Sequence, residues 1–241
     1  MESLLDLHSH ILPGLDDGPE DPDSALELVL GLEKLGFSDF YPTPHQKSSA
    51  WAPGPGACVE AAATLRNLLK QNNSAVTIHP PAGENMWDDL FLDRQADASF
   101  PTYPGGHAFL LEFPPDGLPP NLRELLFGFH IAGRLPVIAH IERYSFAHEA
   151  DRLELLGQSA ALLVNLTALG GGAGFWAKRL TRRLVRRQLA HAVATDAHSA
   201  HDIPACRAGL SWIRSRLGQR ILELLLRDHP QRIISGEIPE W

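Results

Sequence analysis

The sequence predicts an α/β fold, a closed or nearly closed parallel barrel of seven strand–helix units. Short, nearly continuous apolar runs alternate with helix-like periodic runs along the chain, and such apolar runs are typical of parallel strands covered on both faces. The length of 241 residues suits one α/β barrel, for which roughly 250 residues is ordinary. There is no interdomain linker and no internal repeat, so we expect residues 1–241 to form one domain.

Each element follows from its local pattern. Seven apolar runs predict the strands, which are Leu4–His8, Ser38–Tyr41, Val76–His79, Ala108–Phe113, Pro136–His140, Ala161–Leu166 and His191–Thr195. Helical periodicity predicts the helices, which are Ala25–Leu35, Cys58–Lys70, Leu122–Ala132, Arg152–Gly157, Phe175–Leu189, Ala205–Leu217 and Arg220–Arg227. Ser24 is the expected N-cap of the first helix, and Gly36 stands at its stop position.

Proline and glycine mark the loops between these elements. The two longest loops, Gln46–Ala57 and Gly83–Gly106, follow the second and third strands. Long loops that follow barrel strands usually border the active site. We therefore expect the functional residues on that side of the barrel.

Composition excludes several classes of protein. No apolar stretch approaches the ~20 residues that span a bilayer, and no secretory signal is visible. Two cysteines form no disulfide framework and fit a reducing cytoplasm. A cysteine-based phosphatase needs an arginine six positions after its cysteine, and Thr64 and Trp212 stand there after Cys58 and Cys206. The net charge of −8 argues against nucleic acid as a partner.

One segment concentrates positive charge. Its six basic residues are Lys178, Arg179, Arg182, Arg183, Arg186 and Arg187. Spacings of three and four place most of them on one helical face. Such a segment is either the solvated face of a helix or a docking surface for an acidic or phosphorylated partner. The sequence leaves both interpretations open.

Histidines and carboxylates follow six of the seven expected strands, and they are His8, His10, Asp16, Asp17, His45, Glu84, Glu112, His140, Asp196 and His198. Glu84, Glu112 and His140 are spaced by 28 residues each, as expected for a regular strand–helix repeat that delivers them to one barrel rim. His140 alone fits a buried core histidine, and Asp196 alone fits a turn. Together these residues predict a site with two or three metal ions.

The motifs that contain these residues resemble those of the PHP (polymerase and histidinol phosphatase) superfamily. Within it, the sequence is similar to the bacterial manganese-dependent protein tyrosine phosphatases of capsule and exopolysaccharide loci. The resemblance rests on blocks in conserved order, which are Asp6–Gly14 with Asp16–Gly18, Thr43–His45, Gly83–Glu84, Leu111–Phe113, Ala139–Tyr144 and Asp196–His198. It implies a distorted (β/α)7 TIM-like barrel of the PHP type.

The resemblance also implies the roles of individual residues. The metal ligands would be His8, His10, Asp17, His45, Glu84, Glu112, His140, Asp196 and His198. Glu84 and Asp196 would bridge metals or be shared between them, and Arg143 would hold the substrate phosphate. A salt bridge from Arg143 to a nearby carboxylate such as Glu142 is the alternative. Either a metal-bound water or a side chain such as Asp17 or His45 would protonate the leaving group, and the sequence leaves these alternatives open.

The implied reaction is metal-assisted hydrolysis of a phosphate monoester, with a metal-bound hydroxide as the nucleophile. We expect two or three divalent ions, foremost manganese, with iron or zinc as alternatives. The implied substrate is a phosphotyrosine protein, such as a bacterial tyrosine autokinase of polysaccharide export. We expect a cytoplasmic enzyme that can form oligomers.

Two positions depart from the family pattern, and three other functions stay open. Ile141 replaces a common proline, and Ile203 stands where a second phosphate-binding arginine is usual; Arg207 or His201 would have to compensate. One alternative is a histidinol-phosphate or other small-molecule phosphatase. Another is an amidohydrolase. Such enzymes often bridge their metals with a lysine at the end of a strand, and none of the four lysines of this sequence ends an expected strand. The last is a metal-binding scaffold without catalysis.

Overall fold

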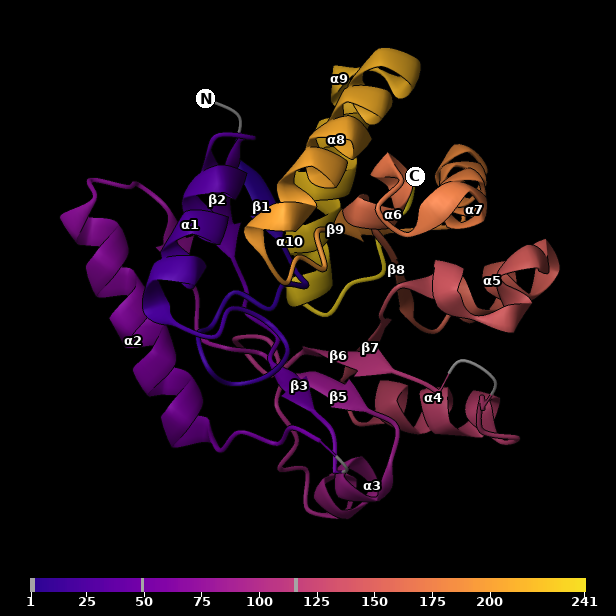
Figure 1. Cartoon of the computed structure of the whole chain (residues 1–241). Helices are drawn as coiled ribbons and strands as arrows, with labels where there is room; N and C mark the ends of the chain where they lie inside the picture. The colour runs from indigo at the N-terminus through magenta and orange to yellow at the C-terminus, as the bar shows by residue number, and fades with distance from the viewer. Residues whose placement is uncertain (1–2, 49, 115–116) are drawn as a thin grey trace.

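A curled parallel β-sheet forms the centre of the molecule, and helices surround it (Figure 1). The computed structural model describes residues 3–48, 50–114 and 117–241. All seven expected strands are present with slightly shifted bounds, as β1 (Leu4–Asp6), β2 (Phe37–Phe40), β4 (Thr77–Ile78), β6 (Ala108–Glu112), β7 (Leu135–Ile138), β8 (Ala161–Asn165) and β9 (Ala192–Ala194). The α/β class with a parallel sheet is therefore confirmed.

Prolines divide the second and third strands into two pieces each. β3 (His45–Gln46) continues the path of β2, and β5 (Glu84–Met86) continues that of β4. The interruptions fall at Pro42 and Pro44 and at Pro80–Pro81, because proline has no backbone N–H to donate to a ladder. These two strands were not predicted, since segments of two or three residues carry too little periodicity to read.

Every strand pairing in the described residues is parallel. The sheet consists of two ladders, one in the order β1-β2-β4 and the other in the order β3-β5-β6-β7-β8-β9. Backbone bonds also join the first strand unit to the last, since Asp196 donates to the carbonyl of His8 and His10 donates to that of Ala197. The buried Asp6 carboxylate accepts hydrogen bonds from the backbone and hydroxyl of Thr195.

Ten α-helices are assigned in the described ranges, and they are α1 (Pro22–Glu33), α2 (Pro55–Gln71), α3 (Asp89–Ala96), α4 (Leu122–Ile131), α5 (Ala150–Gly157), α6 (Leu166–Gly170), α7 (Gly174–Arg186), α8 (Ile203–Leu217), α9 (Gln219–Glu223) and α10 (His229–Ile234). Short turns of other helix types are η1 (Ile141–Arg143), η2 (Ser145–His148), η3 (Ala200–Asp202) and the π-helical η4 (Leu224–Asp228).

Three expectations about the helices and loops are wrong. The N-cap of α1 is Asp21, not Ser24, because the Asp21 carboxylate accepts from the backbone of Asp23 and Ser24 and Pro22 begins the helix. The expected loop Gly83–Gly106 contains β5 and α3, and Asp88 caps α3. The last expected helix, Arg220–Arg227, is divided between α9 and η4, and α10 follows it without having been predicted. The loop Gln46–Ala57 is described except for residue 49, which lies outside the described residues.

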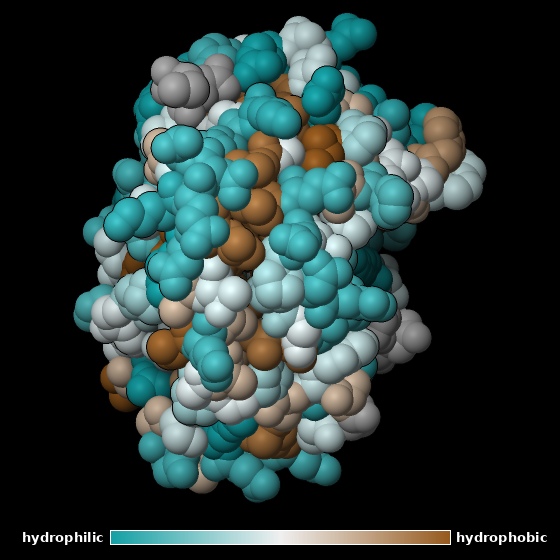
Figure 2. Space-filling model, turned by 60° about the vertical axis from the view of Figure 1, so that its left-hand side comes forward, coloured by the Kyte–Doolittle hydropathy of each residue, from teal (hydrophilic) through white to brown (hydrophobic). Residues whose placement is uncertain are grey.

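Two hydrophobic layers lie on opposite faces of the sheet. The interior layer contains mostly small and medium side chains, including Leu5, Leu7, Ala108, Leu110, Val137, Ala139, Ala161, Leu163, Ala192 and Ala194. The outer layer packs the other strand face against the helices, and Figure 2 shows the outward side around α1 and α2 as mostly hydrophilic with separate brown areas. Because apolar side chains fill the interior, a polar site is confined to its ends.

Both cysteines, Cys58 and Cys206, are free and buried. Among residues 3–48, 50–114 and 117–241, no helix combines the length and the apolar character needed to cross a membrane.

A histidine behind the sheet generates a pH-dependent prediction. His191 Nδ1 accepts the backbone N–H of Leu162, so the ring must be neutral there. Burial and the nearby charge of His229 lower the pKa of His191 to about 4. Its ordinary pKa is about 6.5, so the stability from neutral His191 is complete above that pH. We expect up to about 3 kcal/mol to be lost as pH falls from about 6.5 to about 4.

His191→Asn keeps an acceptor near Nδ1 and removes the titration. Urea unfolding at several pH values should therefore show a smaller loss of stability on acidification in this variant than in the wild type. His148→Asn, at an exposed position, is the matched control. An unchanged pH slope in His191→Asn would refute the assignment.

Candidate metal centre

The predicted ligands all lie at one edge of the sheet, where the strands end. His8 and His10 follow β1, His45 begins β3, and Glu84 begins β5. Glu112 is the last residue of β6, and His140, Asp196 and His198 follow β7 and β9. Because the strands are parallel, their carboxyl ends meet at this edge. Asp17 reaches it from the turn Asp16–Gly18.

Glu84 occupies the middle of the group. Its carboxylate oxygens lie 2.9 Å from His45 Nδ1, 3.1 Å from His8 Nε2 and 3.3 Å from His140 Nε2. The ring of His10 is next, with Nε2 at 3.5 Å. Four imidazoles from three different strand units thus face one buried carboxylate.

Asp196 forms a second centre beside the first. Its Oδ1 atom lies 3.3 Å from His8 Nε2 and 3.6 Å from His10 Nε2. Its Oδ2 atom accepts hydrogen bonds from Arg143 Nη2, at 2.6 Å, and from the Asn165 side chain. Asp196 therefore connects the imidazole cluster to Arg143, at the exposed side of the group.

Two further carboxylates close the group on either side. Asp17 Oδ1 lies 3.3 Å from Nε2 of both His45 and His198. On the other side, Glu112 Oε1 lies 3.3 Å from His140 Nε2. The ligand atoms form three groups, and within each group all of them lie within 4.8 Å of one another. The groups are His10 with Asp17, His45 and His198; His8 with His10 and Glu84; and His45 with Glu84 and Glu112. The structure thus brings all nine predicted ligands together.

The unsatisfied polar atoms of this group fit metal ions. His8 Nε2 and His10 Nε2 face each other at 3.3 Å, although two ring lone pairs repel without a cation or proton between them. Both carboxylate oxygens of Glu84 are buried and accept no well-formed hydrogen bond. Buried polar atoms are normally paired, and imidazole with carboxylate is a donor set that suits manganese, iron and zinc. The residues therefore fit divalent metal ions.

The electrostatics point the same way. Burial alone would raise the pKa of Glu84, but the charge of His8 and the other surrounding imidazoles hold that pKa well below its ordinary value. Burial alone would lower the pKa of His140, but Glu112 and Glu84 raise it to about 10. Clustered carboxylates thus favour positive charge in this cavity, which divalent cations provide.

Two ligand positions have unusual backbone conformations. His140 has φ 31° and Asp196 has φ 50°, in the left-handed region that side chains other than glycine rarely adopt. Each lies two residues after the end of its strand, His140 after β7 and Asp196 after β9. Such conformations cost about 1–3 kcal/mol each and cluster at functional sites.

Asp16 was among the residues that the sequence placed at the site, but the contacts by which Asp16 and Asn165 hold the ligands in place were not predicted. Asp16 Oδ2 lies 2.7 Å from His10 Nδ1 and accepts the backbone N–H of His45. Gly18 makes this turn possible, since a Cβ there would lie 2.2 Å from the carbonyl oxygen of His10. Asn165, on the strand predicted to supply no ligand, donates to Asp196. The pairs that these residues form were invisible because nothing local predicts them.

Arg143 lies at the open side of the group, with its side chain 51% exposed. The alternative of a salt bridge to a nearby carboxylate is confirmed, with Asp196 as the partner. Glu142 instead accepts the backbone N–H of Asn165. Trp51 lies beside the same group, and its ring stacks on that of His45 with centroids 5.5 Å apart. An arginine and an aromatic ring thus flank the metal ligands.

The structure explains the missing second arginine. Ile203 packs against α1, where its Cδ1 would be 2.1 Å from a Cβ built on Gly31. Arg207 cannot compensate, since it lines a groove beside Gly36 and Phe37, at the opposite end of the strands. His201 is exposed in η3, three residues beyond His198, and stays a prediction.

In the described residues none of the four lysines ends a strand, as expected; Lys47 comes after β3, whose last residue is Gln46. Within the described ranges, Lys47 forms no ion pair with a carboxylate of the site. The central position between the imidazoles belongs to Glu84.

Comparisons with known proteins agree with this geometry. A family model described as "Capsular polysaccharide synthesis, CpsB/CapC" matches residues 4–235. The tyrosine-protein phosphatase YwqE of Bacillus subtilis is 30% identical over 198 residues, covering 81% of this chain and 78% of its own. The tyrosine-protein phosphatase CpsB of Streptococcus pneumoniae is 23% identical over 244 residues, covering 98% of this chain and 100% of its own.

Solved structures share the fold. A chain from the crystal structures of YwqE from Bacillus subtilis and CpsB from Streptococcus pneumoniae, described as unique metal-dependent tyrosine phosphatases, matches with a TM-score of 0.86 and 26% identity. The match covers 97% of this chain and 95% of that one. Histidinol phosphate phosphatase from Lactococcus lactis has a TM-score of 0.51 at 16% identity, over 88% and 94% of the two chains. That second likeness shows the fold alone.

The contact between Asp16 and His10 generates a test of the metal centre. Groups that orient a ligand typically contribute about 10- to 100-fold to metal affinity. We therefore expect Asp16→Ala to weaken Mn²⁺ binding by about 10- to 100-fold in isothermal titration calorimetry. Asp21→Ala is the matched control, because it removes a neighbouring carboxylate that caps α1 and contacts no ligand. Equal affinities in the two variants would contradict the orienting role.

Proposed function

Since this chain belongs to the CpsB/CapC family of capsular polysaccharide synthesis, we propose that it is a metal-dependent protein tyrosine phosphatase. The observation that supports this most directly is the group of nine His, Asp and Glu side chains at one rim with Arg143 at its open side. Relatives that match most of the chain are named tyrosine-protein phosphatases. The chemistry of the site and the family thus agree.

The nine residues would hold two or three divalent ions, for which manganese is the proposed metal. Glu84 and Asp196 are the proposed shared ligands, because each lies near at least three other ligands or site residues. When bound, the ions would polarise the phosphate ester and lower the pKa of a coordinated water toward ~7. Every further step can be assigned to residues of the chain.

Arg143 is proposed to bind the phosphate. Its guanidinium is half exposed and fixed at one end by Asp196, which leaves donors that match phosphate oxygens. Negative charge on those oxygens is stabilised by fixed cationic donors in the transition state. Arg143 therefore serves both binding and charge stabilisation.

Hydrolysis replaces the P–O bond to tyrosine with a P–O bond to water, so one proton leaves the water and one reaches the phenolate. A phenol has a pKa of about 10, so its oxygen leaves with modest help compared with an alkoxide. Asp17 and His45 face each other at 3.3 Å on the open side and are the proposed carriers of this proton. Trp51, stacked on His45, is the proposed contact for the phenyl ring.

We also propose the finer features that follow from the family. The curled sheet is interpreted as a distorted (β/α)7 barrel of the PHP type, in which residues 1–241 form one domain. The proposed location is the cytoplasm, and the proposed partner is a phosphorylated tyrosine autokinase of polysaccharide export.

A phosphatase for small alkyl phosphates, such as histidinol phosphate, is the second candidate. The fold is compatible with it, but the aromatic ring of Trp51, which stacks on His45, favours an aryl substrate. A scaffold without catalysis is disfavoured, because the nine ligands and Arg143 converge with their polar atoms directed at one another.

The first test is activity with metal present and removed. We expect Mn²⁺-dependent release of phosphate from a phosphotyrosyl peptide and from p-nitrophenyl phosphate, abolished by chelator and by His45→Ala or Asp196→Ala, since each change removes ligands. Metal content should be measured on the same samples. Protein with stoichiometric metal that cleaves neither phosphotyrosine nor histidinol phosphate would refute the assignment.

The second test is substrate discrimination by Trp51. An aromatic contact contributes about 0.5–1.5 kcal/mol, so Trp51→Ala should raise KM for p-nitrophenyl phosphate by about two- to tenfold. Trp51→Phe should largely restore it. KM for histidinol phosphate or another alkyl phosphate should stay the same. Equal losses on aryl and alkyl substrates would show that Trp51 only supports the loop.

A further inference from the structure

Helix α7 borders the active-site edge of the sheet. It follows β8 and the short α6, so it begins near the carboxyl end of β8, where Asn165 contacts Asp196. It also packs against η1, which carries Arg143. In Figure 1, α7 lies beside α6 and above α5. The first turns of α7 therefore lie on the same side of the molecule as the metal ligands.

The exposed face of α7 carries positive charge that the protein does not neutralise. A groove of about 660 Å³ runs along it, lined by Phe175, Lys178, Arg179, Arg182, Arg183 and Arg186. In the part of the chain that the structure describes, none of these cations forms an ion pair with a carboxylate. By contrast, Arg220, Arg227 and Arg232 near the C-terminus all do.

The crowding of these cations is unfavourable by itself. Arg182 and Arg186 both lie over the ring of Trp212, 4.9 Å and 5.1 Å from its centroid. Burial and the nearby charges of Arg186 and Arg216 lower the pKa of Arg182. In a protein of net charge −8, a concentrated patch of this sign indicates a region that attracts anions.

Two large aromatic side chains stand at the start of the same face. Phe175 is 68% exposed and Trp176 is 78% exposed, and their rings meet edge to face at 5.2 Å. Phe175 is four residues before Arg179, which places the two on one helical face. Exposed aromatic residues next to arginines are the composition of protein-binding surfaces.

We propose that this face of α7 is a docking surface for an acidic segment of the substrate polypeptide that flanks the phosphotyrosine. The inference rests on the proposed function. It extends it by assigning a substrate class, namely phosphotyrosine proteins with acidic sequence beside the modified residue. Arg179 and Arg183 bind the acidic side chains, and Phe175 and Trp176 contact an apolar residue of the same segment.

The structure favours a polypeptide over an anionic membrane as the occupant. A helix that binds a bilayer inserts its apolar face, but the apolar face of α7 is already occupied, because Leu184 and Val185 are buried in the core. The contact with the segment that carries Arg143 also connects this surface to the site of reaction. A membrane is therefore the alternative outcome of the test.

The experiment compares two phosphotyrosyl peptides, one flanked by glutamates and one by glutamines at the same positions, with the manganese-loaded enzyme. We expect kcat/KM to favour the acidic peptide by about tenfold at low salt and the preference to fall as salt is added. Arg179→Glu/Arg183→Glu should remove the preference. Hydrolysis of p-nitrophenyl phosphate, which has no flanking segment, reports whether the metal centre is intact.

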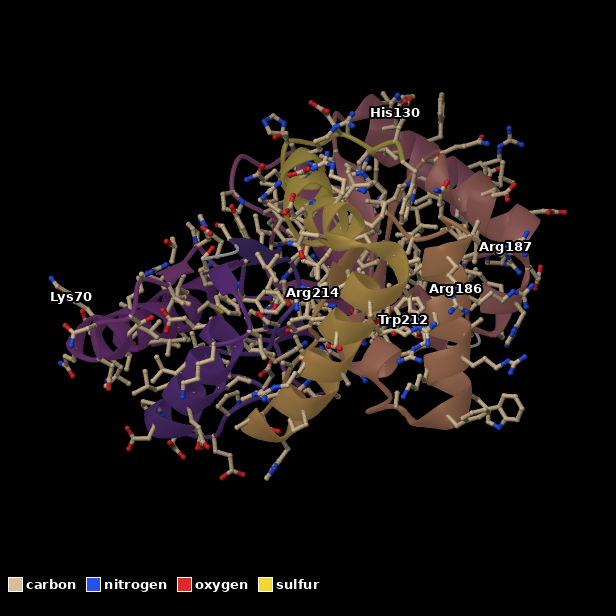
Figure 3. The ribbon with its side chains drawn as sticks, turned by 90° about the horizontal axis from the view of Figure 1, so that it is seen from above. Lys70, His130, Arg186, Arg187, Trp212 and Arg214 are labelled. Carbon is tan, nitrogen blue, oxygen red and sulfur yellow. The ribbon has the colours of Figure 1, made fainter. Side chains whose placement is uncertain are left out.

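The matched control is Lys70→Glu/Arg123→Glu, which changes net charge equally on α2 and α4. Figure 3 shows Lys70 on the opposite side of the molecule from Arg186, the last residue of α7, and from Arg187, which follows it. The control should keep the preference. An unchanged preference in the α7 variant, or an equal loss in the control, would overturn the proposal.

Two further measurements separate the possible failures. If no phosphate ester is cleaved, the proposed function fails, and fluorescence anisotropy with the acidic peptide still tests docking. Binding to phosphatidylserine vesicles that the α7 variant loses, without any change in peptide preference, would overturn the polypeptide proposal in favour of a membrane.

Discussion

The hydrogen bonds between the first and last strand units are the constraint on which the rest of this structure depends. Asp196 donates to the carbonyl of His8, His10 donates to that of Ala197, and Asp6 accepts two hydrogen bonds from Thr195. These residues are almost 190 positions apart in the chain, so their contact carries a large loop-closure entropy. This contact curls the sheet and places the His-x-His motif next to the Asp-x-His motif. Only in that arrangement can the two motifs bind the same cation.

The ligand group is an arrangement of charge that the fold tolerates because its members compensate one another. Burying a carboxylate such as Glu84 is costly, and the four imidazoles around it offset that cost only with protons or metal ions among them. The apolar interior of the sheet leaves no other place for such a group. Local strain at His140 and Asp196 is accepted where the surrounding bonds hold both residues.

The side chains that we propose to bind the substrate lie at increasing distances from the metal ligands. Arg143 and Trp51 lie next to the ligands and suit a phosphate and a phenyl ring. Helix α7 lies further out along the same side and suits a charged segment of a polypeptide. Ile203, which stands where the family pattern has a second arginine, packs against Gly31 of α1, so Arg143 is the one arginine that we propose for phosphate binding.

The sequence by itself determined the seven main strands, most of the helices and the identity of all nine converging side chains. It could do so because burial and strand ends leave a periodic signal, and because ligand chemistry needs specific residue types. Only the tertiary structure decided what holds those side chains in place: Asp16 behind His10, Asn165 on Asp196, Arg143 paired with Asp196 instead of Glu142, and Trp51 over His45. These contacts join residues from different strand units, and a linear pattern carries no information about which side chains meet across a closed sheet. The sequence contains the prolines that divide two strands and the Asp21 that caps α1. Periodicity does not locate these boundaries, because short-range hydrogen bonding sets them.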